Sequence, residues 1–127
     1  RPIRHFAMLP IEMMRCPAYT ELGHYERSVL AALAAEYRGK NNGNIALTFS
    51  QARDLYGIKA SSRFYAALKT LRQHRLIEKT HHGGFNLGQN APARFLLTFQ
   101  PPDDFPQYGV ESSSKPSNKY TEWASEK

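Results

Sequence analysis

Residues 47–99 constrain the fold most, because signals for helix starts, turns and strands follow one another there in a definite order. Thr48 stands three residues before Gln51, the spacing of a capping box in which two side chains satisfy the N–H groups at a helix start. A short helix is therefore predicted from residue 49 to about residue 56. Gly57 should end this helix, since glycine readily adopts the left-handed conformation that closes a helix.

A second helix and a hairpin are predicted to follow. Ser61 or Ser62 can cap a helix that continues to about His74, because serine oxygens accept hydrogen bonds from the free N–H groups of a first turn. Beyond this helix, short β-prone runs alternate with glycine-rich turns. The predicted elements are a strand at 76–80, a turn at His81-His82-Gly83-Gly84, an irregular loop with Gly88 and Pro92, and an antiparallel strand at 93–99.

A longer amphipathic helix is predicted before this stretch. Tyr25, Val29, Leu33 and Tyr37 are each four residues apart, so they share one helical face, and Gly39 is a plausible C-cap. Three smaller elements complete the pattern: a short helix near 10–15, a helical turn starting at Pro17, and a brief strand at 45–47.

The predicted helix at 61–74 has two chemically different faces. Its inner face carries Phe64, Ala67, Leu68 and Leu71, and its outer face carries Ser62, Ala66, Lys69 and Gln73. No acidic residue occurs from Lys59 to His74. Small residues permit close approach to a DNA major groove, and Lys and Gln reach phosphates or base edges. The outer face therefore suits DNA, although an ordinary solvated surface is the alternative.

The predicted hairpin adds hydrogen-bond donors beside this helix. Lys79, His81, His82 and Arg94 lie on its strands or near its turn. Such a hairpin can lie along a DNA backbone or enter the minor groove. The two histidines could instead bind a metal ion, but no third ligand stands at a useful spacing, so no metal site or cofactor is expected.

The stretch LTFSQARDLYGIKASSRFYAALKTLRQHRLIEKTHHGG resembles winged helix-turn-helix DNA-binding domains, and the resemblance extends over residues 24–99. A longer phrase that begins FAMLPIEMMRCPAYTEL is similar to small helix-turn-helix proteins of bacterial prophages and plasmids. The resemblance implies an α+β fold, with a three-helix core and a small antiparallel β-hairpin as the wing. It also implies binding to double-stranded DNA, often by a homodimer.

On this resemblance, a recognition helix at 61–75 and a wing at 76–99 should contact DNA. We expect Lys69 and Gln73 to approach base edges, and Lys79 and Arg94 to meet phosphates. The full set of expected DNA-contacting residues is Lys59, Ser61, Ser62, Arg63, Tyr65, Ala66, Lys69, Thr70, Gln73, Lys79, His81, His82 and Arg94.

Composition divides the chain into three segments. We expect an N-terminal extension with short helices at 1–23, the winged helix-turn-helix domain at 24–100, and a polar, flexible tail at 101–127 that is disordered or laid on the surface. The residues expected to be buried are Tyr25, Val29, Leu33, Leu55, Ile58, Phe64, Leu68, Leu71, Ile77 and Leu97.

The overall charge agrees with a polyanionic partner. The chain has 17 Lys and Arg against 11 Asp and Glu, a net charge of +6 and a pI near 9.6. Cys16 is the only cysteine, so an internal disulfide and a thiolate zinc cluster are excluded. No stretch is apolar enough to span a membrane, and a cytoplasmic protein without membrane contact is expected.

Several functions agree with these patterns. Neither a phosphate-binding loop motif nor a nucleophile elbow is present, so an enzyme is not expected. The first hypothesis is a transcriptional regulator of a mobile element. The alternatives are a plasmid or phage replication initiator or partition protein, and a winged helix that binds proteins, with Tyr120 and Trp123 of the tail docking a partner.

Overall fold

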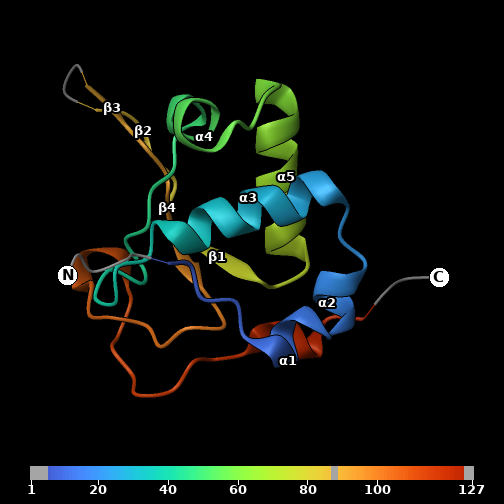
Figure 1. Cartoon of the computed structure of the whole chain (residues 1–127). Helices are drawn as coiled ribbons and strands as arrows, with labels where there is room; N and C mark the ends of the chain where they lie inside the picture. Colours follow the sequence, from blue (N-terminus) through green and yellow to red (C-terminus); the bar gives the residue numbers. More distant parts are fainter. Residues whose placement is uncertain (1–5, 87–88, 125–127) are drawn as a thin grey trace, which may run out of the picture.

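The computed structural model has a mixed α+β fold (Figure 1). It describes residues 6–86 and 89–124, and it describes their side chains except at 84–86 and 89–91. Its α-helices are α1 (Ile11–Met14), α2 (Pro17–Thr20), α3 (His24–Ala35), α4 (Phe49–Tyr56) and α5 (Ser61–Gln73). Its strands are β1 (Ile77–His81), β2 (Gly84–Asn86), β3 (Gln89–Ala91) and β4 (Arg94–Leu97), and two 3-10 helices follow, η1 (Pro106–Tyr108) and η2 (Lys119–Glu122).

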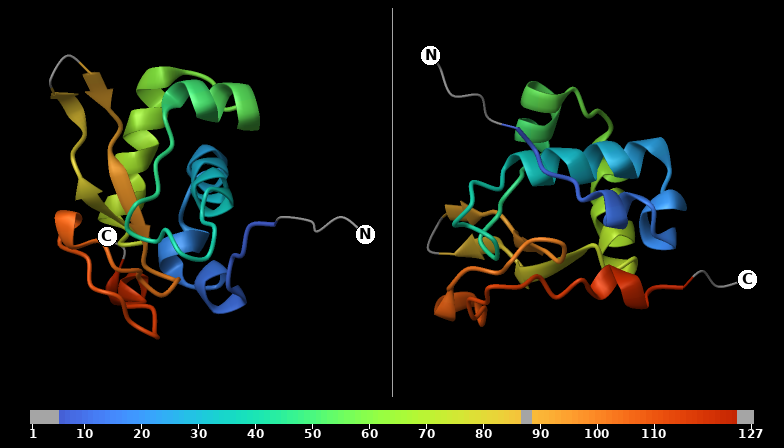
Figure 2. Two further views of the ribbon diagram at one scale, coloured as in Figure 1. Left: turned by 90° about the vertical axis from the view of Figure 1, so that its left-hand side faces the viewer. Right: turned by 60° about the horizontal axis from the view of Figure 1, so that its bottom comes forward.

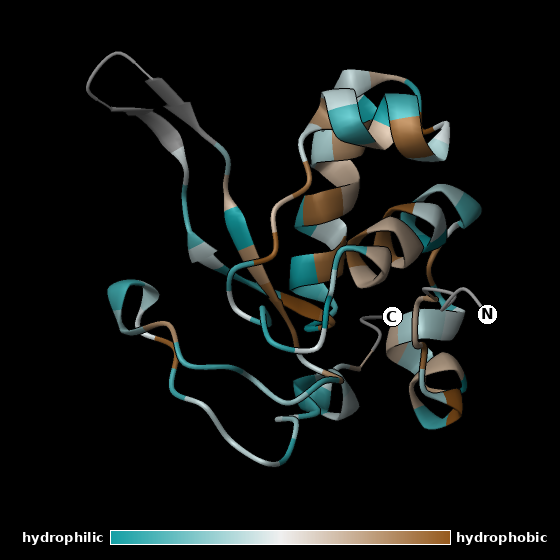
Figure 3. Cartoon of the chain, turned by 60° about the vertical axis from the view of Figure 1, so that its left-hand side comes forward, coloured by the Kyte–Doolittle hydropathy of each residue, from teal (hydrophilic) through white to brown (hydrophobic). Residues whose placement is uncertain are grey.

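The core lies where α3, α5 and the strands β1 and β4 meet, and Figure 3 shows hydrophobic residues gathered there. Phe64 and Leu71 of α5 and Leu33 of α3 are fully buried. Burying one such side chain contributes roughly 1.5–3 kcal/mol. The helical spacing seen in the sequence therefore identifies the packed faces of both helices.

Two antiparallel pairs of strands form the hairpin. β1 pairs with β4, with Ile77 opposite Leu97, and β2 pairs with β3 further out. An isolated bridge joins Ile45 to Phe95, so the brief strand predicted at 45–47 is a single bridging residue. The hairpin projects away from the helices as a long arm (Figures 1 and 2).

The predicted turn at 81–84 is wrong, because the chain continues outward there. His81 still belongs to β1, and Gly84 already begins β2. The irregular loop predicted after Gly84 contains the paired strands β2 and β3 instead. These strands have three residues each and show no alternation of apolar and polar residues. The hydrogen bonds between them therefore define the strands. The tip of the hairpin lies outside the described residues.

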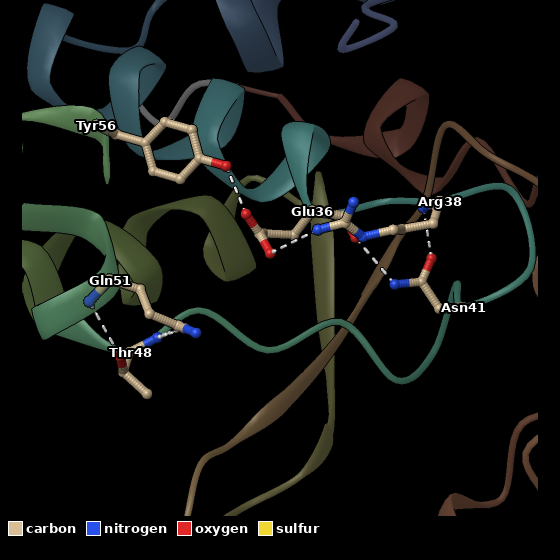
Figure 4. A network of polar contacts seen from close by, with 6 residues as sticks. All are labelled: Glu36, Arg38, Asn41, Thr48, Gln51 and Tyr56. Atoms are coloured by element: carbon tan, nitrogen blue, oxygen red, sulfur yellow. Dashed lines mark hydrogen bonds and ion pairs between the residues drawn. The ribbon is translucent and has the colours of Figure 1, made fainter. Parts of the chain in front are cut away.

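The capping box at the start of α4 is confirmed (Figure 4). The Gln51 backbone N–H donates to the Thr48 hydroxyl at 3.1 Å, and the Thr48 backbone N–H donates to the Gln51 side-chain oxygen at 3.0 Å. The helix ends at Tyr56, and Gly57 follows with a φ of 69°, as predicted. Local chemistry thus determines both ends of this helix.

Figure 4 also shows how α4 is tied to the end of α3. The Tyr56 hydroxyl donates to the Glu36 carboxylate at 2.5 Å, and Arg38 lies 3.8 Å from the same carboxylate. Partial burial, followed by the hydrogen bond to Glu36, raises the pKa of Tyr56 to about 12. Asn41 closes the loop by donating to the Glu36 carbonyl at 2.9 Å.

Three further expectations about individual residues are wrong. Leu55 is 65% exposed, because α4 is short and buries only Ala52. Neither Ser61 nor Ser62 caps α5, whose N-cap is Ala60 with no side-chain hydrogen bond. Gly39 is not the C-cap of α3, since the helix ends at Ala35 and Glu36 is its C-cap. Of the other expected core residues, Tyr25 is only half-buried.

Residues 101–124 lie along the body of the protein, and three of their contacts fix them there. Tyr120 is buried in the main core, and Trp123 stacks on His74 with ring centroids 4.0 Å apart. Lys119 pairs with Glu78 at 2.8 Å, and the hydrogen bond to Glu78 raises the pKa of Lys119 above its usual value. The segment is therefore laid on the surface, which is one of the two alternatives considered for the tail.

Candidate nucleic-acid interface

The helix α5 presents the outer face that its sequence predicts. Ser62, Ala66, Lys69 and Gln73 are exposed, while Leu68 on the opposite side is buried. The face carries no carboxylate along its length. The face therefore has small side chains at Ser62 and Ala66 and a cation at Lys69.

A groove of about 430 Å³ runs between α5 and the base of the hairpin. It is lined by Leu47, Thr48, Tyr65, Leu68, Lys69, Arg72, Lys79, His82, Pro92, Ala93 and Phe95. None of these lining residues is Asp or Glu. We call this feature the helix–wing groove, after the wing that is predicted at residues 76–99.

No carboxylate of the described residues neutralises the cations of the helix–wing groove. Lys69, Arg72 and Lys79 form no ion pair with any residue in the described part of the chain. Glu78 is the only acidic residue from 55 to 100, and its carboxylate pairs with Lys119. The positive potential of the groove is therefore available to an external anion.

Other cations near α5 are engaged within the protein. The Arg63 guanidinium lies over the Tyr25 ring, 4.6 Å from its centroid. Arg75, just beyond the end of α5, pairs with Glu122 at 2.8 Å. These two side chains hold α5 against its neighbours, so they are less free than Lys69 to meet a partner.

The predicted contact residues fall into three groups. Four of them line the helix–wing groove, namely Tyr65, Lys69, Lys79 and His82. Six more lie on the same helix or just before it, namely exposed Lys59, Ser61, Ser62, Arg63 and Ala66, and half-buried Thr70, whose hydroxyl donates to the Ala66 carbonyl at 3.1 Å. The remaining three, Gln73, His81 and Arg94, lie apart from the groove lining.

The last group has different surroundings. Gln73 lines a separate hollow with Glu21, Arg75 and Glu122, in which Arg75 is paired with Glu122. His81 packs against Tyr108, with ring centroids 5.1 Å apart. Arg94 is half-buried opposite His81 in the β1–β4 pair. The structure thus does not bring these side chains into one site with Lys69.

The first turn of α5 is open to solvent and to a ligand. Its N-cap Ala60 supplies no side-chain acceptor, so the first N–H groups of the helix lack a side-chain cap. The Tyr25 hydroxyl donates to the Lys59 carbonyl at 2.6 Å and holds the preceding turn in place. A free helix N-terminus of this kind favours negative charge.

Two polar residues of the groove lining, Arg72 and Thr48, are not among the predicted contacts. Arg72 comes seven residues after Tyr65 and three after Lys69, so the three share one helical stripe. That spacing could have identified Arg72. The sequence predicts Thr48 only as a helix cap, and it comes to the groove because the bridge between Ile45 and Phe95 holds the segment before α4 against β4.

In residues 6–86 and 89–124, no three His, Cys, Asp or Glu side chains are grouped to hold a metal ion. None of the helices described combines the length and apolar character needed to cross a membrane.

No family model matches the chain, and neither a curated protein nor a solved structure is significantly similar to it.

Proposed function

We propose that this protein is a winged helix-turn-helix protein that binds double-stranded DNA. The order of elements supports the proposal: α3, the bridge at Ile45, α4, α5 and then the β1–β4 hairpin. In this arrangement α4 and α5 form the helix-turn-helix, and the hairpin is the wing. The wing stands beside α5 on the side of the helix–wing groove.

The observation that carries the proposal is the absence of carboxylates from the helix–wing groove. Lys69 and Arg72 come from α5, and Lys79 comes from the wing. Two elements thus contribute unpaired cations to one surface, which is what a phosphate backbone between helix and wing requires. An ordinary solvated surface usually mixes both signs of charge.

The dimensions of α5 also suit the major groove of DNA. Its 13 residues span roughly 20 Å at 1.5 Å per residue. Ser62 and Ala66 would allow the helix to approach the base edges closely, and Lys69 would reach a base or a phosphate. Lys79 would hold the backbone on the wing side.

The proposed role is transcriptional regulation of a bacterial mobile element, in the cytoplasm where the DNA lies. Replication initiation and partition would use the same interface on origin DNA. A protein-binding role is the second candidate, and one observation favours it: the N-terminal segment exposes Phe6, Met8, Ile11 and Met14, with exposed fractions of 77, 49, 62 and 38%.

DNA binding is tested by titrating a labelled random-sequence duplex at several salt concentrations. Affinity should fall by orders of magnitude between about 50 and 200 mM salt, because the bound cations release counterions from DNA. Lys79→Gln should lower the slope of log affinity against log salt by about one. Lys115→Gln removes an exposed charge outside the groove and should leave the slope unchanged.

Two results would contradict the proposal. An affinity that does not change with salt would exclude phosphate-dominated binding. Equal effects of Lys79→Gln and Lys115→Gln would show that the groove is not the interface. The first result would favour the protein-binding role of the apolar N-terminal segment.

A further inference from the structure

The floor of the helix–wing groove is apolar, which DNA backbone binding alone does not require. Leu47, Leu68 and Phe95 lie beneath it, with exposed fractions of 4, 8 and 1%. Pro92 and Ala93 continue the floor along the start of β4 and are half-buried. A phosphate chain makes ionic contacts at the rim and would leave the accessible surface of Pro92 and Ala93 uncovered.

The rim of the same groove is polar and cationic. Lys69, Arg72 and Lys79 supply the charge, and Thr48 and His82 supply further polar groups. Tyr65, which is 59% exposed, stands at the α5 side as an aromatic wall. An apolar floor under a cationic rim is complementary to a molecule with an apolar body and an anionic head.

We infer that the helix–wing groove is a binding site for a small organic anion, of the aromatic carboxylate, sulfonate or phosphate class. Its volume of about 430 Å³ lies within the range of about 300–1,000 Å³ usual for small-molecule sites. The ligand body would lie against Tyr65, Pro92 and Ala93, which are exposed or half-buried. Its anionic group would bind Arg72, and Lys69 and Lys79 of the same lining would add positive charge.

Such a ligand would regulate DNA binding. It would occupy the cations that a DNA strand needs, so ligand and DNA would compete for one site. This regulatory consequence rests on the proposed function, whereas the binding of the anion does not. The two can therefore fail separately.

The site is tested with 8-anilinonaphthalene-1-sulfonate, a fluorescent aromatic anion, and with N-phenyl-1-naphthylamine, which has the same rings without the sulfonate. The sulfonate should bind the whole chain with one-to-one saturation. Arg72→Gln and Tyr65→Ser should each weaken it about three- to tenfold, the loss expected for one ionic or aromatic contact. The neutral amine should bind more weakly and should not respond to Arg72→Gln.

Two control variants test whether the sulfonate binds elsewhere on the protein. Phe6→Ser removes an exposed apolar ring from the N-terminal segment, and Lys115→Gln removes an exposed charge outside the groove. Neither should change the affinity of the sulfonate. Circular dichroism of each variant verifies that the fold is retained.

The outcomes separate the two proposals. Displacement of the bound sulfonate by DNA supports both the site and its regulatory role. Binding that depends on Arg72 without any DNA affinity retains the anion site and removes the proposed function. Sulfonate binding that Arg72→Gln leaves unchanged and Phe6→Ser abolishes would overturn the anion site. Equal competition by inorganic phosphate would also overturn it, since the apolar floor would then contribute nothing.

Discussion

At the scale of single residues, Asn42 joins parts of the chain that are far apart in sequence. Its side-chain nitrogen lies 2.9–3.0 Å from the carbonyls of Leu97, Gln100 and Pro101, and its oxygen accepts from the Leu97 N–H at 2.7 Å. The residue is fully buried. It therefore fixes the end of β4 against the loop before α4.

Asn42→Ala should lower the free energy of unfolding by about 2–4 kcal/mol, because it leaves several buried backbone groups without partners. Urea denaturation measures this change. Asn41→Ala is the matched control, since Asn41 is only half-buried, and it should cost about 1 kcal/mol. Equal losses for the two variants would show that the buried network contributes little.

The raised pKa of Tyr56 predicts how the free energy of unfolding changes at high pH. Its pKa is raised from 10.0 to about 12, so the folded state holds the phenol proton more tightly than the unfolded chain does. The stabilisation by the bond to Glu36 is complete below pH 10 and is lost as the pH rises through about 12.

Tyr56→Phe should therefore cost about 1 kcal/mol near pH 8, a low value because the side chain is partly exposed to solvent. Urea denaturation of both proteins at a series of pH values up to about pH 12 measures the difference. The difference should shrink above pH 10. A difference that stays constant over this range would exclude the phenol proton as its source.

At the scale of elements, the turn between α4 and α5 contains a strained residue. Ala60 has a φ of 72° and a ψ of 93°, a conformation that residues with a Cβ rarely adopt. The Tyr25 hydroxyl holds this turn by donating to the carbonyls of Lys59 and Ala60 at 2.6 and 3.1 Å. Packing of α5 against α3 thus imposes the strain.

Ala60→Gly should raise the free energy of unfolding by about 0.5–1 kcal/mol, because glycine relieves the strain but adds entropy to the unfolded chain. Ala66→Gly, at an exposed position within α5, should instead lower it by about 1 kcal/mol. Thermal or urea unfolding measures both. A loss of stability in both variants would show that Ala60 is not strained.

At the scale of the whole molecule, the packing of residues 101–124 makes them part of the folded unit. Trp123 is the only tryptophan, and it stacks on His74 at the end of α5. Its fluorescence therefore reports whether this segment is docked. Far-UV circular dichroism reports the helices.

The two signals should give one coincident unfolding transition in urea, because Tyr120 of the same segment is buried in the main core. Tyr120→Ala should shift both signals to lower urea, with a loss of about 3–5 kcal/mol. A fluorescence change that precedes the loss of helix would show that the segment detaches on its own.

Much of the fold follows from local sequence chemistry. The Thr48–Gln51 box and Gly57 determine the ends of α4, because their hydrogen bonds and backbone conformation involve only near neighbours. The apolar spacing in α3 and α5 likewise predicts which faces are buried. The charge pattern also predicts that the outer face of α5 is cationic.

Features that depend on distant partners could not be predicted in this way. Leu55 is apolar like a core residue, but no other element covers it. Ala60 occupies the N-cap position of α5 in a turn that the Tyr25 hydroxyl holds. The strands β2 and β3 carry no apolar alternation, so only their pairing marks them. The hydroxyl that holds Ala60 comes from Tyr25, 35 residues earlier in the chain, so the local sequence does not reveal it.

The sequence by itself determined the order of the helices, their buried faces and the excess of positive charge. Only the tertiary structure decided which cations share a surface. Lys69 and Lys79 become neighbours across the helix–wing groove because Leu68 and Phe95 pack beneath them, while Arg75 is drawn to Glu122 and Arg63 to Tyr25. The physical reason is that periodicity depends on neighbours along the chain, whereas a binding surface depends on side chains that the packed core brings together.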